Sequence, residues 1–194
     1  MRTHTARFVA GADKAARIPD LHLPEVAFAG RSNVGKSSLL NRLVGHQRLA
    51  RVSKTPGRTQ QINFFVVDER AIFADLPGYG FAHVPLAVKA QWKHLVESYL
   101  VERQSLRAVV VLVDLRRGLQ AEDEALLAYL AAQRIAAIVA ATKLDKLNRT
   151  ERERQLKLLS AQTAKLRGLH VVACSSVTSA GIPELWGLID ACLH

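Results

Sequence analysis

Apolar and polar positions alternate in two rhythms along this chain of 194 residues. Short runs rich in β-branched residues, such as Glu25 to Ala29 and Ala108 to Asp114, are typical of strands, and the longer amphipathic stretches are typical of helices. Two neighbouring runs, Ile62 to Val67 and Ala71 to Leu76, are separated only by the turn sequence DER and predict a hairpin. The other predicted strands and helices are Ala136 to Thr142, His170 to Cys174, Gly35 to Gly45, Pro85 to Arg103, Ala121 to Gln133, Asn148 to Arg167 and Ile182 to Leu193.

This alternation predicts an α/β fold: a mostly parallel six-stranded sheet with one antiparallel edge strand and helices on both faces. The run Ala108 to Asp114 is too apolar to have a polar face, so we expect it in the centre of the sheet. Residues 24–194 are expected to form one domain, preceded by an N-terminal extension of residues 1–23. In such sheets ligands bind beyond the carboxyl ends of the strands.

Composition narrows the class of protein. Hydrophobic residues make up 49% and charged residues 23% of the chain, and its two cysteines are too few for a disulfide framework. No apolar run approaches the ~18 residues of a membrane span. We therefore expect a cytoplasmic protein that is not inserted in a membrane. The 27 Lys and Arg against 17 Asp and Glu favour a polyanionic partner, with a merely soluble basic surface as the alternative.

The sequence GRSNVGKS fits the pattern G-x-x-x-x-G-K-[ST] and stands between a predicted strand and a predicted helix. Glycines let the backbone wrap a phosphate group, and N–H groups at the start of the helix point towards it. Lys36 is predicted to reach the β- and γ-phosphates, and the Ser37 hydroxyl to ligate Mg²⁺. The predicted phosphate loop consists of Gly30, Arg31, Ser32, Asn33, Val34, Gly35, Lys36 and Ser37.

An acid, Asp75, lies at the carboxyl end of the predicted strand Ala71 to Leu76, where the sequence DLPG begins. An Asp shortly before Pro-Gly often just makes a turn, and that is the alternative interpretation. In this topology, however, the strand lies next to the phosphate loop. There Asp75 can hold Mg²⁺ through water, and the Gly78 N–H can meet a γ-phosphate. The predicted nucleotide-contacting residues of this segment are Asp75, Leu76, Pro77 and Gly78.

Two later strand ends carry candidates for recognition of a base. In TKLD, Asp145 can accept hydrogen bonds from the N1–H and the 2-amino group of guanine, a pair of donors that adenine lacks. The Lys143 stem can lie over the base. By itself TKLD is equally an ordinary loop with a Lys–Asp pair. The small residues of CSS would let backbone N–H groups approach a base oxygen. The predicted base site is Thr142, Lys143, Leu144, Asp145, Cys174, Ser175 and Ser176.

Residues His46 to Gln61 show no helical or strand pattern, which is uncommon over such a length in a compact domain. They lie between the first predicted helix and the next strand, in the position of a nucleotide switch. Thr59 can complete the Mg²⁺ shell with Ser37 and Asp75, although ordinary loop threonines are far commoner. The residues of this loop predicted to contact the nucleotide are Gly57, Arg58, Thr59, Gln60 and Gln61.

Taken in order, these strings resemble the TrmE-Era-EngA-EngB-Septin-like branch of P-loop GTPases, and more specifically the EngB family of ribosome-biogenesis GTPases. AFAGRSNVGKSSLLN, SKTPGRTQQINFF, ADLPGYGFA, TKLDKL and CSS carry the resemblance, which spans Ala27 to Ser176. It implies a monomeric Ras-like G domain that binds GTP, GDP and Mg²⁺, assists large-subunit assembly and is linked to normal septum formation. Thr142 stands where most GTPases have Asn, as in the family's own pattern, and CSSVTSAG lacks a lysine frequently found after the serines.

The residue after Gly78 bears on the rate of hydrolysis. Ras-like enzymes have a Gln there that orients the attacking water, whereas this chain has Tyr79, so we expect a slow intrinsic rate. Asn33 stands where similar GTPases bind K⁺, which adds positive charge beside the β–γ bridge. Shaping of the loop by the Asn33 side chain is the alternative. The predicted catalytic residues are Lys36, Thr59, Gly78 and Asn33.

Basic residues gather in two places and indicate ribosomal RNA, and with it the large subunit or its precursor, as the polyanionic partner. The two clusters are Arg48, Arg51, Lys54 and Arg58 in the patternless loop, and Arg152, Arg154, Lys157, Lys165 and Arg167 in a predicted helix. For the helix, a solvated face is an equal alternative.

Two other functions are compatible with the sequence: an ATP-using small-molecule kinase, and a basic RNA-binding module whose nucleotide site is vestigial.

Overall fold

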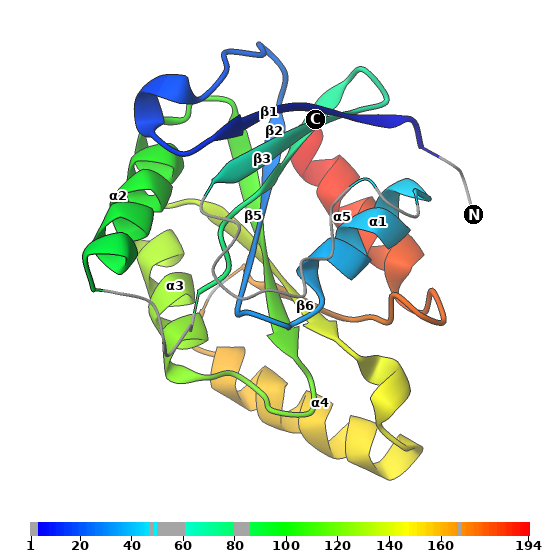
Figure 1. The fold of residues 1–194 in the computed structure, drawn as a ribbon. Coiled ribbons are helices and arrows are strands. Elements are labelled where there is room, and N and C mark those ends of the chain that lie inside the picture. The colour runs from blue at the N-terminus through cyan, green and yellow to red at the C-terminus, as the bar shows by residue number, and fades with distance from the viewer. Residues whose placement is uncertain (1–3, 47–48, 50–60, 80–85, 167) are drawn as a thin grey trace.

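In the computed structural model, seven strands form one sheet within the described residues, which are 4–46, 49, 61–79, 86–166 and 168–194, with backbone only for 86–93 (Figure 1). The strand order across the sheet is β1-β3-β4-β2-β5-β6-β7. β3 runs antiparallel to both of its neighbours, and the other neighbouring strands are parallel. The bounds are Ala6–Ala12 (β1), Glu25–Gly30 (β2), Ile62–Val67 (β3), Ala71–Asp75 (β4), Leu106–Asp114 (β5), Ala136–Thr142 (β6) and His170–Ala173 (β7).

The predicted α/β class is confirmed, but the described sheet has one strand more than the six that the sequence predicts. The additional strand is β1, which lies within residues 1–23 and pairs with β3. The antiparallel strand β3 is therefore second from the edge and not at the edge. The sequence of β1, ARFVAGA, hides this strand because its small residues give no clear apolar–polar alternation. Its pairing with β3 also shifts register between Phe8 and Ala10.

Helices cover both faces of the sheet, as Figure 1 shows with α1 and α5 on one side and α2 and α3 on the other. Leu39 of α1 and Ile189 of α5 belong to one buried cluster, and Leu95 of α2, Leu127 of α3 and Leu159 of α4 belong to the other. None of the helices in the described part of the chain combines the length and apolar character needed to cross a bilayer. The bounds are Lys36–Val44 (α1), Leu86–Glu102 (α2), Ala121–Ala132 (α3), Arg149–Thr163 (α4) and Ile182–Leu193 (α5).

The parallel strands bring their carboxyl ends to one edge of the sheet. β5 lies between β2 and β6, as its apolar sequence predicts. The last residues of these strands are Gly30, Asp75, Asp114, Thr142 and Ala173. Parallel α/β sheets bind their ligands beyond this edge, so the sequence motifs that end strands converge on one place.

The N-terminal segment is tied to the last helix as well as to the sheet. The His4 ring stacks on Trp186 of α5, with ring centroids 4.1 Å apart. His4 Nδ1 lies 2.6 Å from Asp68 Oδ2 in the β3–β4 turn, and the Thr5 N–H donates to Asp68 Oδ1 at 2.9 Å. The segment that precedes β1 is thus held by the β3–β4 turn and by α5.

Candidate nucleotide-binding site

The segment between β2 and α1 is a tight loop of the kind that wraps a phosphate group. Gly35 has φ of 104° and Asn33 has φ of 64°, in the left-handed region that favours glycine and tolerates asparagine. A Cβ on Gly30 would lie 2.8 Å from Val34 Cγ1, so only glycine fits there without a shift. Because α1 begins at Lys36, the N–H groups of its first turn lie at this loop, where they favour an anion.

Asp75 and Lys36, both predicted to bind the nucleotide, contact each other. Asp75 ends β4 opposite Phe28 in the ladder with β2, and the N–H of the buried Leu76 donates to the Phe28 carbonyl at 3.0 Å. The Asp75 carboxylate forms an ion pair with Lys36 Nζ. Their side chains are only 7% and 12% exposed, so each charge offsets much of the desolvation cost of the other. Ser37 follows in the first turn of α1 and is partly buried.

The segment after β4 lies directly on the phosphate loop. The Tyr79 N–H donates to the Gly30 carbonyl at 3.3 Å, and the Ser32 N–H donates to the Tyr79 carbonyl at 2.9 Å. Pro77 is buried, and a Cβ built on Gly78 would lie 3.6 Å from both the Gly30 carbonyl oxygen and the Ser32 nitrogen. The structure therefore brings Gly78 and the phosphate loop together, as their positions in the sequence predict.

The Tyr79 side chain is held by α3. Its hydroxyl donates to Asp123 Oδ1 at 2.8 Å, and Asp123 Oδ2 accepts the Gln120 N–H at 3.0 Å at the start of the helix. Asp123 is 2% exposed. Burial, and after it the Asp123 carboxylate, raises the pKa of Tyr79 well above its usual range. The hydroxyl is therefore a permanent donor to Asp123, and Asp123 is a contact that the sequence analysis does not predict.

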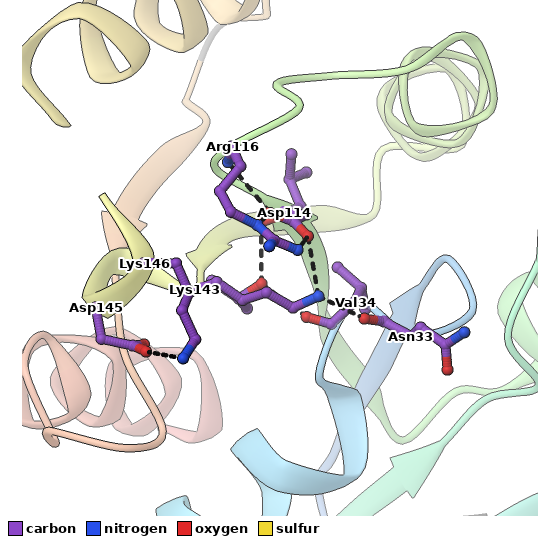
Figure 2. A network of polar contacts seen from close by, with 9 residues as sticks. Asn33, Val34, Asp114, Arg116, Lys143, Asp145 and Lys146 are labelled. Atoms are coloured by element: carbon purple, nitrogen blue, oxygen red, sulfur yellow. Dashed lines mark hydrogen bonds and ion pairs between the residues drawn. The ribbon is translucent and has the colours of Figure 1, made fainter. Parts of the chain in front are cut away.

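On the other side of the phosphate loop, TKLD is joined to it by two side chains. The buried Thr142 hydroxyl lies 2.8 Å from the Val34 carbonyl oxygen and 3.2 Å from that of Val113. Lys143 has φ of 63°, and its Nζ donates to the Asn33 carbonyl at 2.7 Å (Figure 2). The Thr142 side chain thus supplies a hydrogen bond between the loop and β6.

Asp114 anchors this connection from the end of β5. Its Oδ2 lies 2.9 Å from Lys143 Nζ, and its two oxygens accept from the Arg116 guanidinium at 2.9 and 2.7 Å (Figure 2). Burial alone would raise the pKa of Asp114, but the hydrogen bonds from Arg116 and Lys143 outweigh it and lower the pKa to about 2. Asp114 therefore stays ionised and fixes the Lys143 ammonium beside the phosphate loop.

Asp145 is oriented by the loop after β7. The Ser175 hydroxyl donates to Asp145 Oδ1 at 2.7 Å. Lys146 Nζ lies 3.6 Å from Asp145 Oδ2 (Figure 2). The Ser175 hydrogen bond is the main reason that the pKa of Asp145 is below its usual value. The Leu144 N–H donates to the Cys174 carbonyl at 3.2 Å, which joins TKLD to CSS. The ionised carboxylate keeps acceptor capacity for a ligand.

Some predicted residues cannot be placed in this site. Gln61 is described, and its amide donates to Asn63 Oδ1 at 2.9 Å and packs against Gly11 of β1. Predicted residues that lie outside the described part of the chain are Arg48, Arg51, Lys54, Gly57, Arg58, Thr59, Gln60 and Arg167.

Three residues at the site escape the sequence analysis: Asp114, Asp123 and Arg42. Asp114 carries a signal that could have found it, because it ends an apolar strand as Asp75 does. For Asp123, the only signal in the sequence is an acid in the first turn of a predicted helix, a position typical of capping. Arg42, whose guanidinium donates to the Ser176 carbonyl, carries no local signal.

Three features define a P-loop GTPase domain. They are a glycine-framed loop between β2 and α1, the Asp75 carboxylate at the end of the adjacent strand β4, and the Asp145 carboxylate after β6, two strands away from β2. Residues 25–143 match the family described as "50S ribosome-binding GTPase". The chain is 46% identical over 193 residues to the probable GTP-binding protein EngB of Geobacter metallireducens, covering 100% of this chain and 94% of that protein. The probable EngB of Streptococcus thermophilus is 41% identical, with 98% and 96% covered. The chain belongs to the EngB family of GTP-binding proteins.

Solved structures agree with this assignment. A crystal structure of a probable GTP-binding protein engB has a TM-score of 0.70 and 26% sequence identity, and the match covers 87% of this chain and 98% of that one. Era, crystallised with MgGDPNP and nucleotides 1506–1542 of 16S ribosomal RNA, has a TM-score of 0.69 and 25% identity. That match covers 89% of this chain and 57% of Era, so the shared part is the G domain fold.

Proposed function

We propose that this protein is a GTP-dependent switch that assists assembly of the large ribosomal subunit in the cytoplasm and supports normal cell division and septation. One observation carries the proposal: Lys143 joins the Asn33 carbonyl of the phosphate loop to TKLD, whose Asp145 is already oriented by Ser175. Groups suited to phosphates and groups suited to guanine thus stand at one edge of the sheet. The residues of the predicted phosphate loop, DLPG, TKLD and CSS would together form this GTP and GDP site.

The residues present also fit Mg²⁺. Asp75 is a nearly buried carboxylate beside the phosphate loop, and oxygen donors of this kind are what Mg²⁺ prefers. We propose that Ser37 and Asp75, with Thr59, hold the ion. When bound, Mg²⁺ supplies positive charge to the β- and γ-phosphate oxygens. Lys36 would leave Asp75 for the phosphates, and the Gly78 N–H would meet the γ-phosphate and release it after hydrolysis.

Hydrolysis is proposed to be slow and to depend on K⁺. Tyr79 has no amide to orient a water, and its hydroxyl is engaged by Asp123, so it supplies no catalytic group. K⁺ beside Asn33, when bound, supplies positive charge near the β–γ bridge. The backbone of Asn33 is left-handed, so Asn33→Gly removes the side chain without strain, unlike Asn33→Ala.

The test of this step compares GTP hydrolysis in K⁺ and in Na⁺. We expect K⁺ to be faster for the wild type and the difference to vanish in Asn33→Gly. Equal rates of the wild type in both salts would contradict a role for K⁺.

The proposed partner is ribosomal RNA of the large subunit or its precursor, contacted by a monomer through its basic surface. Membership of a ribosome-binding GTPase family and the net charge of +10 support this. On α4, Arg154 and Lys157 are exposed, as phosphate contacts require.

Co-sedimentation with large ribosomal subunits tests the proposed function. We expect binding with a non-hydrolysable GTP analogue to exceed binding with GDP and to weaken steeply as salt rises. The double variant Arg154→Gln with Lys157→Gln should lower the affinity for the large subunit and flatten its salt dependence. Arg107→Gln serves as the control, because Arg107 is exposed at the amino end of β5. Binding that is absent, or insensitive to both nucleotide and salt, would refute the proposal.

A further inference from the structure

Arg42 connects the phosphate-loop helix to the loop after β7. It lies in the last turn of α1, and its Nε donates to the Ser176 carbonyl at 2.6 Å and its Nη2 to the Val177 carbonyl at 3.3 Å. The contact spans 134 positions of sequence, so only the fold brings these groups together. Bonds from a charged guanidinium to a carbonyl are among the stronger hydrogen bonds in proteins.

The two peptide units that Arg42 holds are also held from their other side. In a planar trans peptide unit the C=O and the N–H point in opposite directions. The N–H groups opposite these carbonyls belong to Val177 and Thr178, and each donates to Ser175 Oγ at 3.1 Å. Arg42 and the Ser175 hydroxyl therefore grip the same two peptide units from opposite ends.

This arrangement decides where the Ser175 proton goes. A serine hydroxyl has one proton to donate and two lone pairs that accept. Both lone pairs are used by the Val177 and Thr178 N–H groups, and the proton is directed at Asp145 Oδ1, 2.7 Å away. Ser175 is fully buried, so water does not compete for the hydroxyl. Linked hydrogen bonds of this kind polarise one another, and the positive charge of Arg42 reinforces the bond to the carboxylate.

We propose that Arg42 is a positioning residue of the guanine site. Its guanidinium is engaged by the Ser176 and Val177 carbonyls and would act on the base only through them. It holds residues 175–178 so that Ser175 presents its proton to Asp145 Oδ1, which leaves Oδ2, beside the exposed Lys146, for the base. The inference rests on the proposed binding of guanine nucleotides. It also makes α1 a connection between the two halves of the site, since its first residue is Lys36 and its last turn carries Arg42.

Two ligands separate a positioning role from a general structural one. Magnesium pyrophosphate reports on the phosphate side alone, and GDP reports on both sides. We expect Arg42→Met to weaken GDP by about tenfold while the affinity for pyrophosphate stays unchanged. Arg42→Lys, which keeps the charge but loses the fork of donors, should recover part of the GDP affinity. Arg107→Met is the control, because Arg107 also donates to a carbonyl, that of Gln104, at 3.2 Å but at the opposite edge of the sheet.

Calorimetric titrations of the full chain with both ligands give the answer. Unchanged GDP affinity in Arg42→Met, or equal weakening of GDP and pyrophosphate, would overturn the inference. If Arg42→Met does not fold, Arg42→Lys takes its place: a selective loss for GDP supports the inference, and an equal loss or none overturns it. A wild type that binds GDP no more tightly than ADP would instead refute the proposed function itself.

Discussion

The two halves of the nucleotide site differ in how their charged groups are satisfied. On the phosphate side, Lys36 and Asp75 neutralise each other. In the proposed function, both would find new partners when phosphates and Mg²⁺ bind. On the base side, Asp145 is held by Ser175 in a way that leaves it able to accept further hydrogen bonds. Phosphate binding would therefore be an exchange of partners, whereas base binding would add contacts to an arrangement that already exists. Preorganisation of the second kind gives selectivity at a small conformational cost.

Removing Lys36 should have the largest effect, because it acts on the side where partners are exchanged. Lys36→Ala loses the cation for two phosphates and leaves Asp75 nearly buried without its counter-charge. We expect the affinities for GDP and for pyrophosphate to fall together, on the order of a thousandfold. Calorimetric titration of both ligands checks this. A GDP affinity that survives the substitution would show that the loop does not bind the phosphates.

Asp145→Asn acts on the base side of the site and should weaken GDP selectively, in contrast to the joint loss expected for Lys36→Ala. The amide offers only one accepting oxygen, so we expect GDP to weaken by about a hundredfold while pyrophosphate is unaffected. Xanthine has a carbonyl where guanine has its 2-amino group, and the amide NH₂ can donate to it. Binding of xanthosine diphosphate by the variant but not by the wild type would therefore show that residue 145 contacts the 2-position of the base. A wild type that does not distinguish GDP from ADP would contradict this role of Asp145.

Asp114 stands between the halves, and its effect should appear in stability. A pKa lowered from 3.8 to about 2 corresponds to about 2 kcal/mol of folding free energy. This contribution is fully present above the unfolded pKa near 4 and is lost as pH falls through the folded pKa near 2. We expect Asp114→Asn to lower the free energy of unfolding by that amount at pH 7, and the difference from the wild type to shrink below pH 4. Denaturant titrations from pH 7 to pH 3 test this. A difference that is constant with pH would assign the effect to packing.

Tyr79→Phe should have the smallest effect. It removes the hydroxyl that donates to Asp123, at a cost of about 1 kcal/mol, but takes nothing from the reacting groups. Single-turnover GTP hydrolysis should stay within about twofold of the wild type. A large loss of rate, with K⁺ and Na⁺ giving equal rates, would make the tyrosine part of the catalytic machinery.

Sequence alone could predict the parts of this site that depend on local chain geometry. The phosphate loop and Asp75 follow from glycine spacing and from an acid at a strand end, and Asp145 follows from the order of motifs. Arg42 and Asp123 were not predictable because their partners lie 134 and 44 positions away, and nothing in the intervening pattern fixes the approach. β1 escapes prediction for a related reason: it is a small-residue edge strand whose partner, β3, lies far along the chain.

The stacking of His4 on Trp186 has a consequence for the kinetics of folding. It closes a loop that contains nearly all of the described chain, and β1 pairs with β3 across the whole of α1, whereas β3 and β4 meet through a short turn. Closing long loops costs more conformational entropy, so we expect the local hairpin to form early and the β1 edge late. Edge segments that are fixed late also open at low free energy, and their amide hydrogens exchange first. In a chain with Trp92→Phe, the fluorescence of Trp186 would therefore report the release of β1 before the rest of the sheet unfolds.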